Sequence, residues 1–251
     1  MIKNHEINGV NVIIADTPKE VDEEAAFLVS GSVLHNSRSV LGLAAGSSTA
    51  GVFKAIIPFL EKYRLSFSCC KAFAMDEYIG LPELCPASCG DRIMKSFIIP
   101  VGIQPSNFYS PSPRDEEAVC VEYEEKIKKA GGIDLFILGL GVNGHVGFNE
   151  PLTDFDRGVH IAELSAATLE AGKQKFEAVG YHDNVPHKGI TVGLRNIMKS
   201  RSILVVAKGH AKSSAIASSL LGKITTSIPA SILRLHPNVT FVLDKDSAAD
   251  L

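Results

Sequence analysis

Residues 139–151 carry a concentrated group of side chains that could do chemistry. The stretch reads Gly-Leu-Gly-Val-Asn-Gly-His-Val-Gly-Phe-Asn-Glu-Pro and follows the apolar run 133–138. Histidine titrates near neutral pH and can move protons, and a nearby carboxylate can polarise its ring. We therefore take His145 as a candidate acid/base, with Glu150 as the carboxylate close enough to polarise it. The glycines of the stretch would let the backbone approach a ligand closely.

Two other interpretations of this stretch compete with catalysis. The pattern Gly-x-Gly-x-x-Gly that begins at Gly139 matches a dinucleotide-binding turn, but such a turn needs a helix whose N-terminus faces the pyrophosphate. Gly147 and Pro151 both oppose a helix here. Alternatively, His145 and Glu150 are only the polar end of a structural strand. The predicted strands and helices around the stretch are needed to choose between these interpretations.

The rest of the chain predicts an α/β fold, with an open, mostly parallel Rossmann-like sheet and helices on both faces. Short apolar or β-branched runs alternate with helical patterns, as in βαβ units. We expect strands at 11–15, 39–43, 67–75, 133–138, 189–194, 202–207 and 239–243. We expect helices at 18–35, 50–63, 88–97, 114–129, 165–179 and 211–221. In such sheets the ligand crevice lies at the carboxyl ends of the strands.

The core candidates of the first two helices follow from their apolar positions. In 18–35 and 50–63 these are Phe27, Val33, Leu34, Phe53, Ile56, Ile57 and Leu60. His236 is expected to be a buried core histidine, and the lysines of the helix 165–179 are expected at the surface. The segment 81–112, rich in proline, serine and cysteine, either covers the site as a lid or connects two units.

Composition limits the classes of function. A chain of 251 residues with mean hydropathy +0.15 suits one α/β domain, which we expect to span 1–251. The net charge of −3 with mixed signs argues against nucleic acid as a partner, and no apolar stretch is long enough for a membrane span. Five cysteines without a secretion pattern indicate reduced thiols and a cytoplasmic location. No second cysteine pair stands at zinc-site spacing, so we expect no metal.

Two further stretches are candidates for binding and catalysis. The small residues Gly46, Ser47, Ser48 and Thr49 lie between an expected strand and an expected helix, where free N–H groups suit a phosphate. The alternative is an ordinary helix cap made by Ser48 or Thr49. Lys212, in the first turn of an expected helix, is unfavourable to the helix dipole unless an anion offsets it, so it is a second phosphate candidate.

A pair of carboxylates follows the expected strand 67–75. Because side chains alternate along a strand, only one of Asp76 and Glu77 can face a site squarely. A partly desolvated carboxylate there would have its pKa raised into the range useful for proton abstraction. The alternative is that Asp76 caps the next turn.

Taken together, the chain resembles the glucosamine-6-phosphate deaminase/isomerase family over nearly its whole length. The matching segments are 41–46, 75–81, 133–151, 189–194 and 228–236. Related sugar-phosphate lactonases share a Gly-His loop here but not the Phe-Asn-Glu-Pro of 148–151, which favours the amino-sugar branch. The resemblance implies a reaction without metal or cofactor, in which an amino-sugar 6-phosphate opens, isomerises from aldose to ketose and releases ammonia.

By the same resemblance, Asp76 would take the C2 proton. His145, with Glu150 and Asn143, would open the ring. Gly46, Ser47, Ser48, Thr49 and Lys212 would hold the phosphate. The partner would be a small sugar phosphate, and the resemblance also implies a homo-oligomer.

The chain departs from the family pattern at several positions. Ser47 and Ser48 replace two glycines, and Gln174 or Lys175 stands near a phosphate-contacting arginine of relatives. Residues 85–89 look more like the galactosamine-6-phosphate branch, which would yield tagatose 6-phosphate rather than fructose 6-phosphate. A 6-phosphogluconolactonase-like hydrolase and a non-catalytic sugar-phosphate sensor remain the alternatives.

Overall fold

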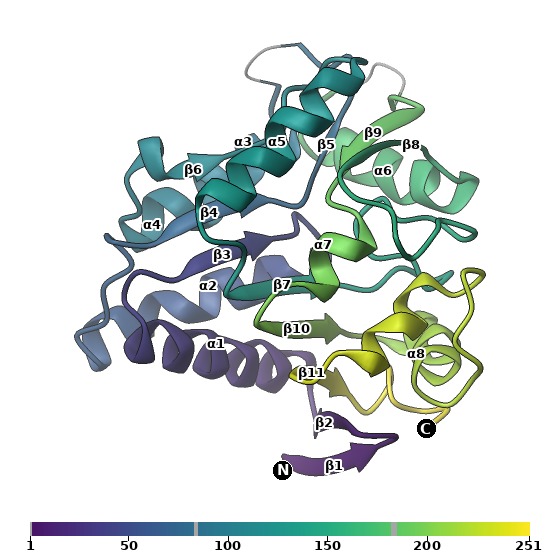
Figure 1. Ribbon diagram of the computed structural model, residues 1–251. Helices are drawn as coiled ribbons and strands as arrows, with labels where there is room; N and C mark the ends of the chain where they lie inside the picture. Colours follow the sequence, from purple (N-terminus) through teal and green to yellow (C-terminus); the bar gives the residue numbers. More distant parts are fainter. Residues whose placement is uncertain (1, 83–84, 182–184) are drawn as a thin grey trace.

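The computed structural model describes residues 2–82, 85–181 and 185–251. Its centre is an eight-stranded sheet of order β1-β2-β11-β10-β7-β3-β4-β6, in which the described pairings are parallel except that of β1 with β2 (Figure 1). The strands are β1 (Lys3–Ile7), β2 (Val10–Ala15), β3 (Val40–Leu43), β4 (Lys71–Ala74), β6 (Phe108–Tyr109), β7 (Leu135–Gly139), β10 (Ser202–Ala207) and β11 (Val239–Asp244).

The direction of the connections changes between β3 and β7. From β3 the chain moves outward to β4 and β6, whereas from β7 it moves the other way to β10 and β11. Since ligands bind at such a switch point in open α/β sheets, the loops that follow β3 and β7 are expected to border the site. The residues 135–138 of β7 are all buried, as its unbroken apolar run predicts.

Helices cover both faces of this sheet (Figure 1), and the predicted fold class is confirmed. One face carries α1 (Pro18–His35), α2 (Ser47–Lys62), α3 (Cys89–Ile93), the π-helical turn Met94–Ile98 and α4 (Ile99–Val101). The other carries α5 (Glu117–Lys129), α7 (Leu194–Met198), α8 (Ser213–Leu220) and the 3₁₀ segment Pro229–Leu235. Within the described residues, none of the helices is long and apolar enough to cross a membrane.

A second, three-stranded antiparallel sheet was not predicted. It has the order β5-β9-β8, with β5 (Asp76–Tyr78), β8 (His160–Glu163) and β9 (Lys188–Thr191), and α6 (Ala166–Ala178) packs beside it. The expected strand 189–194 lies here, not in the main sheet. The expected strand 67–75 ends earlier, because the chain turns at Met75: its N–H donates to Leu43 of β3 and its carbonyl accepts from Val192 after β9.

Three of the predicted core residues are exposed. Phe27 and Leu34 of α1 are 54% and 57% exposed, whereas Val33 is buried as expected. The buried face of α1 is made mainly of small and β-branched side chains such as Ala25 and Val29, which pack closely, and the larger side chains lie on the opposite face. In α2, Ile57 is exposed and Leu60 is half-buried, while Phe53 and Ile56 are buried.

His236 is the buried histidine that the sequence predicts. Its Nδ1 accepts a hydrogen bond from the N–H of Asn238 (3.1 Å), so Nε2 carries the proton and donates to the carbonyl of Ser200 (2.9 Å). These two hydrogen bonds account for the burial of His236 without a role in ligand binding.

Candidate active site

A crevice opens at the carboxyl ends of β3 and β7 and contains about 870 Å³ of empty space, part of it open to solvent. It brings together candidate residues that lie far apart in the sequence. The candidates that line it are Gly46, Ser47, Ser48, Asp76, His145 and Lys212. Asn143 and Glu150 lie directly behind His145, and Thr49 does not line the crevice.

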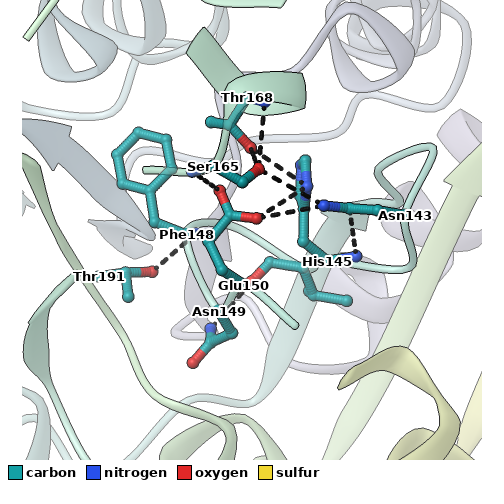
Figure 2. A network of polar contacts seen from close by, with 9 residues as sticks. Asn143, His145, Phe148, Asn149, Glu150, Ser165, Thr168 and Thr191 are labelled. Carbon is teal, nitrogen blue, oxygen red and sulfur yellow. Dashed lines mark hydrogen bonds and ion pairs between the residues drawn. The ribbon is translucent and has the colours of Figure 1, made fainter. Parts of the chain in front are cut away.

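His145 is held in a polar network with its predicted partners (Figure 2). Its Nδ1 lies 3.6 Å from Oε2 of Glu150 and 3.3 Å from Oγ1 of Thr168. Nδ2 of Asn143 donates to the same Glu150 oxygen (3.3 Å), and Oδ1 of Asn143 accepts from the N–H of His145 (3.2 Å). The other oxygen of Glu150 accepts from the N–H of Ser165 (3.1 Å). Glu150 and Asn143 thus fix both the ring and its backbone.

The loop that carries this network is tied to the small sheet. The N–H of Phe148 donates to Oγ1 of Thr191 (3.2 Å), and Nδ2 of Asn149 donates to the carbonyls of Val146 and Val192 (2.9 Å each). As predicted, no helix follows the glycine pattern; residues 140–152 form turns and an isolated bridge. The geometry that a dinucleotide-binding turn needs is therefore missing.

Gly141 is required by the position of the imidazole. A Cβ at this residue would lie 2.3 to 2.4 Å from three ring atoms of His145, far inside van der Waals contact. Its absence lets the ring lie against the backbone of the loop. The glycine that resembled part of a nucleotide motif serves side-chain packing instead.

His145 is neutral at physiological pH. Its pKa is lowered to about 4, mainly because the ring is buried; Glu150 opposes this shift, and the positive charges of Lys212 and Lys175 contribute to it. The nearby carboxylate favours the proton on Nδ1, which leaves Nε2 without a partner among the described residues. A neutral imidazole in this state can accept a proton from a ligand.

Asp76 faces the crevice, and its neighbour points away from it. The pKa of Asp76 is raised to about 6, mainly because the carboxyl group is buried; the charges of Lys175 and Arg92 oppose this rise, and Glu77 contributes to it. Glu77 instead accepts from the N–H groups of Cys89 (3.0 Å) and Gly90 (2.9 Å) at the start of α3. As predicted from the alternation of side chains along a strand, only one of the two carboxylates, Asp76, lines the crevice. The burial of Asp76 agrees with the expected rise in its pKa.

The N-terminus of α2 is free of side-chain caps. Helices α1 and α6 are capped by the hydroxyls of Thr17 and Ser165, but the residue before α2 is Gly46, which has no side chain. The hydroxyl of Thr49 donates to the carbonyl of Ala44 (2.6 Å) and accepts from the N–H of Gly46 (3.1 Å). The helix begins at Ser47, three residues earlier than predicted, because Ser48 and Thr49 do not cap it. Its first N–H groups therefore face the crevice without intrahelical partners.

Two lysines and an arginine also line the crevice. Lys212 precedes α8, which begins at Ser213, and burial and the nearby Lys175 lower its pKa. Lys175 comes from α6 and Arg92 from α3. None of the three pairs with a carboxylate among the described residues. Positive charge thus gathers near the free end of α2, as an anionic ligand requires.

Sequence reasoning did not assign five of these residues to the site. From its place in a helix Lys175 was expected at the surface, although the resemblance set it or Gln174 near a phosphate-contacting arginine of relatives. Arg92 and Cys89 belong to the segment interpreted only as a lid or connector. Ser165 and Thr168 could have been found from the pattern Ser-x-x-Thr at the start of a helix, which is typical of an N-cap. Nothing in the local sequence indicates that this cap faces His145.

The candidate residues do not form a metal site in this arrangement. Across the described ranges, groups of three or more His, Cys, Asp or Glu side chains placed to hold a metal ion are absent. The free N–H groups and positive charges that face the crevice suit an anionic ligand.

Comparisons with known proteins agree with this geometry. Residues 16–148 match the family described as glucosamine-6-phosphate isomerases/6-phosphogluconolactonase. The chain belongs to this family. It is also 40% identical over 244 residues to a protein named glucosamine-6-phosphate deaminase from Clostridium botulinum strain Hall, covering 96% of this chain and 99% of that one. A protein of the same name from Halothermothrix orenii is 38% identical over 242 residues, with the same coverage of both chains.

Two solved structures superpose on this chain over nearly its whole length. A structure described as a monomeric glucosamine-6-phosphate deaminase superposes with a TM-score of 0.90 at 32% identity, covering 96% of this chain and 99% of that one. The 6-phosphogluconolactonase from Trypanosoma brucei superposes with a TM-score of 0.73 at 18% identity, covering 96% and 98%. At that identity the lactonase shows only that the fold is shared.

Proposed function

We propose that the protein is an isomerising deaminase of an amino-sugar 6-phosphate, which it converts to a ketose 6-phosphate and ammonia. One observation carries the proposal: Asp76 and the neutral His145 face a single crevice that also holds the free end of α2 and two lysines. The family and the names of the relatives support the same reaction class.

The phosphate would bind at the free end of α2. The N–H groups at Ser47 and Ser48 and the ammonium groups of Lys212 and Lys175 supply donors and positive charge. Thr49 would act indirectly, because its hydroxyl is used to hold the turn from Ala44 to Gly46. In this proposal Lys175 takes the part of the arginine that relatives carry.

Ring opening would fall to His145. Nε2 takes the proton of the anomeric hydroxyl, the bond between C1 and the ring oxygen breaks, and the ring oxygen takes the proton back. Between these two steps the imidazole is positively charged, and the carboxylate of Glu150 at 3.6 Å stabilises it. Asn143 keeps Glu150 in place and thereby fixes the Nδ1 tautomer.

Asp76 would then act on the open-chain sugar. With a pKa of about 6, its carboxyl group is mostly ionised at neutral pH and is still basic enough to take the C2 proton. The electron pair of the C2–H bond forms a double bond between C1 and C2, and the C1 carbonyl oxygen takes a proton from water and becomes a hydroxyl. A proton returned to C1 gives an imine at C2, and water hydrolyses this imine to the ketone and ammonia.

For the sugar itself we propose galactosamine 6-phosphate as the preferred epimer. The segment 85–89, which resembles the galactosamine branch, contributes Cys89 to the wall of the crevice, and Ser47, Ser48 and Lys175 differ from the family pattern around the phosphate. The curated relatives carry the glucosamine name, so glucosamine 6-phosphate is the competing substrate.

The oligomeric state and the cellular location stay predictions. The similar solved structure is described as monomeric, which is a property of that protein, and a homo-oligomer of this chain remains to be tested by light scattering. All five cysteines are free, which agrees with the reduced thiols expected of a cytoplasmic protein.

The test is to measure release of ammonia from galactosamine 6-phosphate and glucosamine 6-phosphate side by side, with a metal chelator present. The expected result is release from at least one epimer, and the larger kcat/KM identifies the substrate. Hydrolysis of 6-phosphogluconolactone is measured on the same preparation. Lactone hydrolysis without any release of ammonia would overturn the proposal in favour of the lactonase.

A further inference from the structure

An ion pair joins the carboxyl end of β10 to α1. Lys208 directly follows β10, and its Nζ lies 2.5 Å from Oδ1 of Asp22 in α1. The two side chains are only 16% and 17% exposed, although the residues lie 186 positions apart in the sequence. Neither residue lines the crevice, so the pair has no direct part in the reaction described above.

On one side, the pair lies against the helix whose free end faces the crevice. Helices α1 and α2 lie side by side (Figure 1), and the carboxylate of Asp22 fits against Gly51 in the second turn of α2. A Cβ at Gly51 would lie 2.0 to 2.6 Å from all three atoms of this carboxylate, so the close approach requires glycine. Asp22 therefore contacts α2 one turn after Ser47 and Ser48, whose N–H groups face the crevice.

On the other side, the pair holds the first residue of the loop that leads to Lys212. The N–H of the next residue, Gly209, donates to both carboxylate oxygens of Asp244 (3.0 and 3.1 Å). The carbonyl of Gly209 accepts from the N–H of Lys212 (3.0 Å). Asp244 is buried and is itself held by the N–H of Ser247 (2.8 Å). These contacts fix the loop 208–212 at both ends and limit where the ammonium group of Lys212 can lie.

Stability alone is a weak reason for such a pair. Burial raises the pKa of Asp22, although the hydrogen bond from Lys208 and its positive charge oppose this rise. A partly buried ion pair has to recover the cost of taking both charges out of water, so its net contribution to stability is small. The contact does, however, fix α1, α2 and the end of β10 relative to one another.

We propose that the ion pair of Asp22 and Lys208 is a brace that positions the two parts of the phosphate site, the free end of α2 and the loop that carries Lys212. Asp22 holds the first part and Lys208 holds the second, so that both parts can contact one phosphate group. The two residues are positioning residues and do not touch the ligand. This inference rests on the proposed function, in which the phosphate binds between these two parts.

The variants that break the brace are Asp22→Ala, Lys208→Met and the double variant. The matched control is Arg201→Met, at the other end of the same strand: Arg201 precedes β10, and its Nη1 lies 2.5 Å from Oδ1 of Asp134. The readouts are the dissociation constant of inorganic phosphate by calorimetry, KM and kcat for the amino-sugar phosphates, and Tm. Binding of inorganic phosphate needs no turnover, so it tests the brace independently of the reaction.

The brace predicts that both single changes weaken phosphate binding. We expect the dissociation constant of phosphate and KM to rise by about three- to tenfold, with kcat changed by less than about twofold. The double variant should bind phosphate no more weakly than the single variants, because either single change already breaks the contact. Arg201→Met should leave phosphate binding and KM unchanged, even where it lowers Tm.

A purely electrostatic effect would give shifts of opposite sign. Loss of Lys208 leaves an unpaired negative charge near the free end of α2 and weakens phosphate binding, whereas loss of Asp22 leaves a positive charge and strengthens it.

The possible outcomes test the two proposals separately. Opposite shifts, additive shifts in the double variant, unchanged phosphate binding, or an equal shift in Arg201→Met would overturn the brace, while wild-type turnover continued to support the deaminase. Absence of turnover by the wild-type protein with both amino sugars would overturn the proposed function.

Discussion

The two ends of the crevice differ in how their charges are matched. At one end Asn143, His145 and Glu150 contact one another and are held by Ser165 and Thr168 (Figure 2). At the other end, the first N–H groups of α2 and the ammonium groups of two lysines have no carboxylate or cap among the described residues.

This difference indicates whether each end stabilises charge that forms during the reaction or charge that the ligand carries. In the proposed reaction, the matched end is prepared for charge that develops during proton transfer, because the partner of the imidazolium is already in place. The unmatched end is prepared for charge that arrives with the proposed ligand, because its phosphate would supply the missing negative partner. Changes at the first end should therefore lower kcat, and changes at the second should raise KM.

The largest effect is expected for Asp76→Asn. The amide cannot accept the C2 proton, so kcat for ammonia release should fall by about a thousandfold or more, within the range typical of a lost general base. The dissociation constant of the amino-sugar phosphate, measured by calorimetry, should change little. Asp156→Asn, which alters an exposed carboxylate, is the control. Comparable turnover by Asp76→Asn and the wild type would remove Asp76 from the mechanism.

Gly141→Ala should damage the matched end without touching a polar group. The new Cβ would force the imidazole of His145 away from its place. Displacement by about 1 Å can cost about a hundredfold in rate, so kcat should fall by that order while KM is kept. Gly31→Ala is the matched control, because a Cβ at Gly31 in α1 meets nothing within 4 Å. A larger change in KM than in kcat would contradict the division between the two ends.

Lys212→Ala should weaken binding at the unmatched end. Loss of a charged hydrogen bond to phosphate is worth about 1.5 to 3 kcal/mol, so KM should rise by about ten- to a hundredfold with little change in kcat. The effect should shrink as ionic strength rises, because salt screens the wild-type interaction. Lys223→Ala, which changes an exposed lysine, serves as the control. An unaltered KM would show that the phosphate binds elsewhere.

Lys175→Ala should have the smallest effect on activity, and it should change the titration of both Asp76 and His145. The positive charge of Lys175 lowers the pKa of Asp76 and of His145, so its removal must raise both. Since Asp76 has to be ionised, the acidic limb of kcat/KM should move upward by less than about one pH unit. Activity at pH 6 should fall more than activity at pH 8. A limb that stays in place would mean that Lys175 acts on the phosphate alone.

The sequence predicted the parts of the fold that depend on strongly apolar strands. The run at β7 and the alternation of strands and helices predicted the parallel sheet, and the polar loop after β7 predicted that His145 and Glu150 lie together. The edge strand β1 was missed because Lys3–Ile7 is polar and exposed. The small antiparallel sheet was missed because the turn at Met75 depends on its bonds to β3 and β9, which leave no local pattern.

The same reasoning explains which site residues could be found. Asp76 and His145 lie in short motifs directly after strands, where side chains reach the crevice. Lys175 and Arg92 lie on helices, and only the packing of α6 and α3 brings them to the site. Their neighbours in the sequence differ little from those of solvent-exposed charges, so tertiary structure was needed to identify them.

The most direct test of the account is to follow the wild-type reaction in D₂O by ¹H NMR, with galactosamine 6-phosphate and glucosamine 6-phosphate in parallel. The account predicts loss of the C2 proton signal, release of ammonia in amount equal to the ketose 6-phosphate, and solvent deuterium at C1 of that product. Unchanged C2 protons with no release of ammonia from both sugars would contradict it.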